Sequence, residues 1–316
     1  MKALLLVLAL ILSSGVLSAQ GDQATVFRSG TELVSLSVVV TNPQQQFVTG
    51  LAMEDFSVFE DGVLQDLSFF SATAVPIDLA ILLDTSASMT DKIKTVQEAA
   101  VGFAASVRPG DRLTVVDIKD GVRVVHPLND DVAAANDAIR KTVARGSTSL
   151  YNGLYMTLKE LVRQRRNNGE VRREAIVVLS DGDDTSSLVT YDDVMDEAKR
   201  AGVSIYTITL KSPHVVRLAQ QNGERVFSEA DFAMKSLAQE TGGKSFTPME
   251  VTELAGVYDV IARELATQYA LGYTPKNART DGKYRRVVVR VSQPGTSTRT
   301  RAGYVAPRAQ RSTRLQ

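Results

Sequence analysis

Five side chains with oxygen donors follow predicted strands or precede predicted helices in this chain. Asp84, Ser86 and Ser88 form an Asp-x-Ser-x-Ser sequence after an apolar run, which places one carboxylate and two hydroxyls on a single turn. Thr148 lies in a Gly-Ser-Thr-Ser loop before a predicted helix, and Asp181 follows a second apolar run. Small, hard cations such as Mg²⁺ and Mn²⁺ prefer oxygen ligands. The residue types therefore predict a divalent-cation site built on oxygen.

Other kinds of site find little support in the same sequence. The chain has no Cys, which excludes disulfides, thiol catalysis and thiolate metal sites, and it has two histidines, His126 and His214. We expect His126, at the end of a predicted strand, to be structural. No Gly-x-x-x-x-Gly-Lys-Ser/Thr sequence occurs, so a phosphate-binding loop is not predicted. A Gly-x-Ser-x-Gly sequence is also absent, which argues against a Ser-His-Asp hydrolase.

The pattern of apolar residues predicts an α/β domain between residues 76 and 266. The predicted strands are 77–83, 112–118, 122–127, 175–179, 203–210 and 244–246. The predicted helices are 91–107, 131–144, 150–166, 190–200, 230–240 and 252–266. Such alternation gives a doubly wound, mostly parallel sheet with helices on both faces, as in Rossmann-like folds. Ligands bind such sheets at the carboxyl ends of the strands, so we expect the five side chains to lie at one edge.

The two ends of the chain have strand patterns instead. The predicted strands are 33–41, 56–59, 67–70, 269–273, 284–291 and 299–305. Because three strands alone bury too little surface, we expect residues 24–75 and 267–306 to pair into one smaller, discontinuous all-β domain. Residues 211–229 lack periodicity and are expected to form an insertion loop, and 307–316 a mobile tail.

The first 19 residues match a secretory signal peptide. Lys2 precedes an unbroken apolar run over 3–12, and small residues follow over 13–19. A buried N-terminal helix is the alternative. The apolar run is too short for a membrane-spanning helix, which needs ~20 residues, and no second long run follows. We expect cleavage near Ala19, no membrane span in the mature protein, and a secreted or periplasmic location.

The charge balance gives no reason to expect a polyanionic partner. The chain has 36 Lys and Arg against 36 Asp and Glu, a formal net charge of zero. Without a basic field, nucleic-acid binding is not expected. A local group of arginines has no aromatic residues between its members for stacking bases, and we expect a solvated helix end and loop. This group consists of Arg163, Arg165, Arg166, Arg172 and Arg173.

The predicted metal residues resemble the metal-ion-dependent adhesion site (MIDAS) of von Willebrand factor type A (VWA) domains. The resemblance covers about residues 76–266. Its elements are Asp84, Ser86 and Ser88 as the Asp-x-Ser-x-Ser sequence, Thr148 within GSTSLYNGL, and Asp181 within LSDGDDT. More loosely, residues 51–62, 268–275 and 301–307 resemble the flanks of VWA-related domains in secreted bacterial proteins.

The resemblance implies a role for each residue. Ser86 and Ser88 bind the cation directly, Thr148 binds it directly or through water, and Asp84 and Asp181 act largely through bound waters. With few charged ligands the cation keeps an open position that a partner's carboxylate completes, so metal and partner strengthen each other's binding. The implied function is exported, Mg²⁺- or Mn²⁺-dependent protein binding (adhesion or interaction) without substrate turnover.

Several alternatives stay open. Asp, Ser and Thr are favoured helix caps regardless of any metal. One alternative function is a metal-dependent hydrolase, for example of phosphate esters, in which the cation would activate water. Another alternative is a structural or assembly component, in which the metal site is incidental to the function. Asp183 and Asp184 are interpreted as solvated loop carboxylates, with an acidic rim or a second cation site as the alternative. The partner and the oligomeric state do not follow from the sequence.

Overall fold

The computed structural model of the chain describes residues 33–72, 75–168, 172–181, 183–210 and 228–308. The predicted signal peptide, His214 and nearly all of the predicted insertion loop lie outside the described residues. Arg308, at the start of the predicted tail, forms an antiparallel bridge with Asp281. Within the described part of the chain, no helix is both long and apolar enough to cross a membrane.

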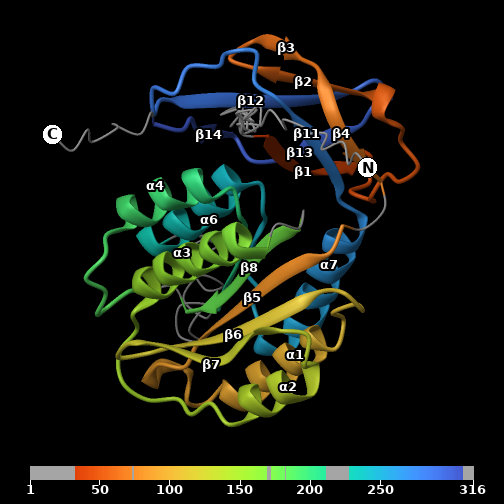
Figure 1. The fold of residues 1–316 in the computed structure, drawn as a ribbon. Helices are drawn as coiled ribbons and strands as arrows, with labels where there is room; N and C mark the ends of the chain where they lie inside the picture. Colours follow the sequence, from red (N-terminus) through yellow and green to blue (C-terminus); the bar gives the residue numbers. More distant parts are fainter. Residues whose placement is uncertain (1–32, 73–74, 169–171, 182, 211–227, 309–316) are drawn as a thin grey trace, which may run out of the picture. The chain divides into compact units, whose positions relative to one another are not determined.

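The central sheet has six strands in the order β10-β9-β8-β5-β6-β7 (Figure 1). All neighbours are parallel except β6 and β7. The strands are β5 (Ile77–Asp84), β6 (Arg112–Ile118), β7 (Val122–Asn129), β8 (Arg173–Ser180), β9 (Ser204–Thr209) and β10 (Ser245–Phe246). Every residue of β5 and β8 is buried, as their continuous apolar runs predict. Pro127 is tolerated because β7 is an edge strand.

Helices cover both faces of this sheet, which confirms the predicted doubly wound α/β fold (Figure 1). One face carries α1 (Ile93–Ala104), α2 (Val132–Arg140) and α7 (Leu254–Thr267). The other face carries α3 (Leu150–Asn168), α4 (Tyr191–Ala201) and α6 (Glu229–Thr241). The described residues also form the 3₁₀ turns η1 (Met53–Asp55), η2 (Ala87–Met89) and η3 (Val251–Glu253).

The ends of α4 follow the capping signals in the sequence. Thr190 accepts a hydrogen bond from the amide of Asp193 in a capping box, and Gly202 ends α4 at φ +69°. The helix predicted over 131–144 ends earlier, at Arg140. There the side chain of Gln97 donates to the carbonyls of Ile139 and Thr142, so it satisfies groups that a longer helix would have used.

Strands from the two chain ends pair with each other in two antiparallel sheets, as expected. The first has the order β13-β1-β11-β4 and the second β14-β12-β2-β3. The strands are β1 (Val34–Thr41), β2 (Phe56–Glu60), β3 (Val63–Gln65), β4 (Leu67–Ser71), β11 (Tyr269–Tyr273), β12 (Tyr284–Val291), β13 (Ser297–Arg299) and β14 (Gly303–Val305). Side chains from both sheets form one apolar core. The domain boundaries at 75/76 and 266/267 remain predictions.

Two details of these sheets differ from the prediction. The single strand expected over 299–305 is wrong, because β13 and β14 are separate strands in different sheets. The three-residue strand β3 was not predicted. It follows the Asp61-Gly62 turn, where both residues have positive φ. Its Val63 and Leu64 side chains are exposed and its one buried residue, Gln65, is polar, so it has no buried apolar side chain.

A buried carboxylate links strands of both antiparallel sheets. Glu60 on β2 is 2% exposed and accepts hydrogen bonds from the hydroxyls of Tyr273 on β11, at 2.9 Å, and Tyr304 on β14, at 2.8 Å. The guanidinium of Arg285 on β12 pairs with its other oxygen at 3.3 Å. Because the buried charge is fully partnered, it can specify how the strands of the two chain ends meet.

The expectation of a solvated helix end holds for the exposed Arg163, Arg165 and Arg166. It is wrong for Arg172 and Arg173, which are engaged in the fold. Arg172 pairs with the buried Asp78, and Arg165 pairs with Glu174. Arg173 is 6% exposed and donates to the carbonyls of Val75 and Leu265. Arg163 pairs with Glu160 on the surface of α3. Most of these charges therefore hold segments together.

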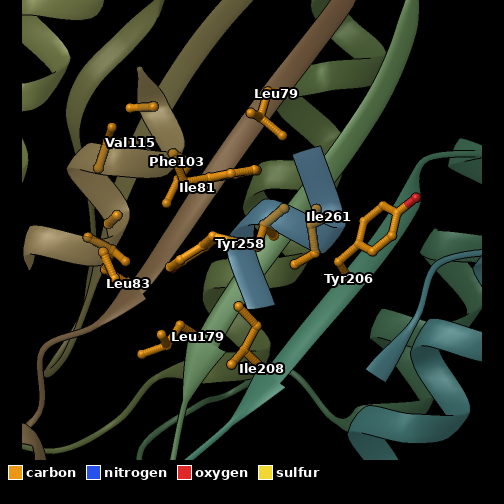
Figure 2. Close-up of a cluster of buried hydrophobic side chains, with 14 of the residues drawn as sticks. Leu79, Ile81, Leu83, Phe103, Val115, Leu179, Tyr206, Ile208, Tyr258 and Ile261 are labelled. Atoms are coloured by element: carbon orange, nitrogen blue, oxygen red, sulfur yellow. The ribbon is translucent and has the colours of Figure 1, made fainter. Parts of the chain in front are cut away.

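Tyr258, in the core between the sheet and α7, carries an uncompensated polar atom. Figure 2 shows the Tyr258 ring among aliphatic side chains, and it stacks on Phe103 with ring centroids 4.7 Å apart. The Tyr258 hydroxyl is buried and has no hydrogen-bond partner among the described residues. Such a group loses its hydration on folding without replacement.

We expect Tyr258→Phe to raise the free energy of unfolding by about 1 kcal/mol, because it removes the uncompensated hydroxyl and keeps the ring. Urea unfolding of both proteins measures the change. Tyr206→Phe is the matched control, since the Tyr206 hydroxyl donates to Glu264 at 2.6 Å and accepts from Gln268 at 2.8 Å. That variant should lose stability. A loss in Tyr258→Phe would contradict the interpretation.

A second prediction concerns the pH dependence of stability. Burial raises the pKa of Glu174 from 4.5 to about 7, and the pairing with Arg165 only partly opposes the rise. Between these pH values the unfolded chain binds fewer protons than the folded one, so this carboxyl lowers stability as pH rises from 4.5 to 7. Urea unfolding across that range should show a shallower decline for Glu174→Gln than for the wild type. Glu160→Gln, at a more exposed ion pair, should decline like the wild type.

Candidate metal site

Four of the five predicted residues lie at the carboxyl ends of neighbouring strands. Asp84 is the last residue of β5, Ser86 is the N-cap residue of η2, and Ser88 lies within η2. Asp181 follows β8, which pairs in parallel with β5. Met89, directly after Ser88, is fully buried in the core and anchors the turn. The sheet therefore brings these side chains to one edge, as the strand pattern predicts.

The Asp84 carboxylate is buried and held from two sides. Its Oδ2 accepts a hydrogen bond from the Ser180 hydroxyl at 2.7 Å, and its Oδ1 accepts one from the amide of Ser86 at 2.9 Å. Burial raises the pKa of Asp84, the nearby charge of Asp181 adds to the rise, and the bonds from Ser180 and Ser86 oppose it. A divalent cation between the two carboxylates would relieve both the desolvation and the repulsion.

The hydroxyls of Ser86 and Ser88 have a spacing that suits a small cation. Their oxygens are 3.0 Å apart and hydrogen-bonded to each other, with Ser86 buried and Ser88 exposed. Two adjacent ligands of an octahedral Mg²⁺ at about 2.1 Å from the metal would be about 3 Å apart. Ser86 is the N-cap residue of η2, but its side chain makes no capping hydrogen bond there. Capping therefore does not explain the Ser86 hydroxyl.

The loop that carries Thr148 is attached to both of the other loops. The amide of Ala87 donates to the Gly146 carbonyl at 3.0 Å, which connects it to the turn after β5. The carbonyl of Thr148 accepts hydrogen bonds from the amides of Thr185 and Ser186, both at 3.0 Å, which connects it to the loop after β8. Thr148 itself is 4% exposed. All five predicted residues thus belong to one hydrogen-bonded group of loops.

Two residues that support this arrangement were not predicted. Ser180 orients Asp84, and its place beside Asp181 at the end of an apolar run was a signal that could have found it. Asp120 accepts hydrogen bonds from the amide and hydroxyl of Ser147, at 2.8 and 3.0 Å. A Cβ at Gly146, whose φ is +74°, would lie 2.2 Å from the Asp120 carboxylate. No local pattern indicates Asp120, because it acts on a loop 27 positions away.

The acidic residues beyond Asp181 match the interpretation as loop carboxylates. Asp183 is exposed, and Asp184 accepts a hydrogen bond from the amide of Ser187 within its own loop. In the described ranges, no group of three or more His, Asp or Glu side chains is placed to hold a metal. Hydroxyls must therefore supply part of any ligand set at this edge. The donors present fit a hard cation, whose preferred ligands are oxygen.

Comparison with known proteins agrees with this fold. A model of the von Willebrand factor type A domain matches residues 78–240. A UPF0353 protein of Mycolicibacterium paratuberculosis is 28% identical over 202 residues, which are 59% of this chain and 60% of that protein. The match thus covers less than two-thirds of that relative's length.

Two solved structures are also similar. A von Willebrand factor type A protein from Catenulispora acidiphila has a TM-score of 0.50 at 13% identity, over 89% of this chain and 76% of that chain. Proximal thread matrix protein 1 from the mussel byssus, with a zinc-occupied MIDAS motif, has a TM-score of 0.49 at 16% identity, over 65% and 49% of the two chains. Since the family match covers more than half of the residues and spans Asp84 to Asp181, the chain belongs to the von Willebrand factor type A domain family.

Proposed function

We propose that this chain is an exported, non-enzymatic module that binds protein partners through Mg²⁺ or Mn²⁺ at its candidate metal site. Domains of the family bind protein partners and often hold a divalent metal at a MIDAS. The observation that carries the proposal is the 3.0 Å spacing of the Ser86 and Ser88 hydroxyls beside Asp84, whose carboxylate Ser180 orients. Serine hydroxyls so placed give the cation neutral ligands.

Each residue has a separate part in this proposal. Ser86 and Ser88 bind the cation through their hydroxyls, and Thr148 joins them directly or through water. Asp84 and Asp181 accept hydrogen bonds from waters around the metal. When bound, the cation supplies an open position for a carboxylate of the partner. Because neither protein carboxylate is a direct ligand, the cation stays electrophilic enough to attract that acid.

The composition of the ligand set supports Mg²⁺ or Mn²⁺. The five side chains offer hydroxyl and carboxylate oxygens, with no thiolate or imidazole among them. Such ligands suit magnesium and manganese better than they suit softer metals.

A metal-dependent hydrolase is the second candidate. It would need a general base within reach of the metal-bound water. His126, the histidine that the structure describes, is buried on β7 opposite Val115 and so lies away from the strand ends. Turnover of a phosphoester panel that EDTA abolishes would favour this candidate over a binding module.

The first site prediction concerns the metal. We expect Ser86→Ala and Asp84→Asn to weaken Mg²⁺ binding by more than about a hundredfold, since loss of outer-shell partners alone costs up to that much. Titration calorimetry measures the affinity, and circular dichroism checks that the fold is retained. Ser204→Ala, at the opposite end of the sheet, is the matched control and should bind like the wild type. Unchanged Mg²⁺ affinity in both site variants would refute the assignment.

The second prediction concerns the partner. Exported proteins captured by the immobilised chain in Mg²⁺ should be lost in EDTA and should not bind to Ser86→Ala, because the partner's carboxylate needs the metal. Quantitative mass spectrometry compares the three conditions. Equal capture in all three would favour a structural component with an incidental metal site.

The third prediction concerns export. We expect the mature protein recovered from the periplasm or the medium to lack the first 19 residues, because Lys2, the apolar run and the small residues form a signal peptide. Intact mass measurement of the recovered protein tests this. A full-length chain found only inside the cell would contradict export.

A further inference from the structure

The ammonium group of Lys119 joins the end of β6 to two of the loops that carry the candidate metal residues. Its Nζ is 2.6 Å from Oδ2 of Asp117 on β6, 3.3 Å from the carbonyl of Val143 in the loop before α3, and 3.4 Å from the hydroxyl of Thr85 after β5. An ammonium has three hydrogens to donate, so these acceptors account for all of them. The Lys119 side chain is 14% exposed, and that of Asp117 is 3% exposed.

Thr85 receives this support between two of the proposed metal residues, Asp84 and Ser86. Its amide donates to the Ile118 carbonyl at 2.9 Å, and its own carbonyl accepts from the amide of Arg145 at 2.8 Å. Its hydroxyl donates to Asp117. Thr85 is fully buried, so no water can replace these bonds. A shift of the turn after β5 would break several of them at once.

The charge of Lys119 works against a cation site nearby. A positive side chain repels Mg²⁺, and removing it should strengthen metal binding if electrostatics alone decided the affinity. Lys119 and Asp117 together are neutral, and their separation of 2.6 Å makes them a close ion pair. What the pair offers the site is therefore geometry, since it attaches the end of β6 to Thr85 and to the loop that carries Thr148.

We propose that Lys119 is a positioning residue of the metal site, which acts through Thr85 and the Val143 carbonyl to hold the turn 84–88 and the Thr148 loop at one separation. This inference rests on the proposed function. It does not require Lys119 to touch the cation or the partner, and it explains why a lysine lies beneath a site that must attract a cation.

The test uses Asp117→Asn/Lys119→Met. This double variant leaves the net charge unchanged and leaves no buried charge unpaired, and the new amide can still accept the hydrogen bond that the Thr85 hydroxyl donates at this position. We expect Mg²⁺ affinity to fall by about tenfold in titration calorimetry, the range seen when outer-shell partners are lost. Amide hydrogen exchange of Ala87 and Arg145, which join the two loops, should also become faster.

Two further variants separate the explanations. Lys119→Arg keeps the charge and the donors and should bind Mg²⁺ nearly as well as the wild type. Lys141→Met removes an exposed lysine at the end of α2 and reports the purely electrostatic effect of losing one positive charge. Wild-type affinity in the double variant, even with a lower unfolding temperature, would overturn the positioning role. Absence of Mg²⁺ binding in the wild type would instead refute the proposed function.

Discussion

Parallel pairing of β5 with β8 is the constraint on which the candidate metal site depends. Leu83 lies opposite Leu179, so the two strands end side by side and the Ser180 hydroxyl reaches the Asp84 carboxylate across 96 positions of sequence. Both strands are buried along their full length, so the apolar surface that each one buries holds this register. A one-residue shift would turn every side chain to the opposite face and remove Asp84 from its partner. The site chemistry is thus tied to the stability of the core.

Buried ion pairs hold both ends of the same sheet. At the amino end of β5, Asp78 accepts hydrogen bonds from Arg112, which begins β6, and from Arg172, which precedes β8. At the carboxyl end, Asp117 and Lys119 connect β6 with the loops around the site. Burying such pairs costs desolvation energy, so their contribution to net stability is modest. Their fixed geometry instead specifies which segments meet, which suits a site assembled from several loops.

Much of the fold follows from local patterns in the sequence. The period of the apolar residues predicts the strands and helices of the α/β domain, since a strand buried on both faces is a continuous apolar run and a covered helix repeats every three to four residues. At the two chain ends, the sequence patterns of some strands were too weak to predict those strands correctly. The strand β3 has three residues and buries no apolar side chain. The residues between β13 and β14 continue a strand-like sequence, although the chain changes sheets there.

The sequence by itself determined which residue types stand after β5 and β8, and hence that Asp84, Ser86, Ser88 and Asp181 would share one edge. Only the tertiary structure decided that Ser180 orients Asp84, that Asp120 holds the loop of Thr148, and that Lys119 connects three segments. The reason is physical. A local pattern reports how one element buries its own side chains, whereas these residues gain their roles from partners that strand register and loop packing bring close from distant parts of the chain.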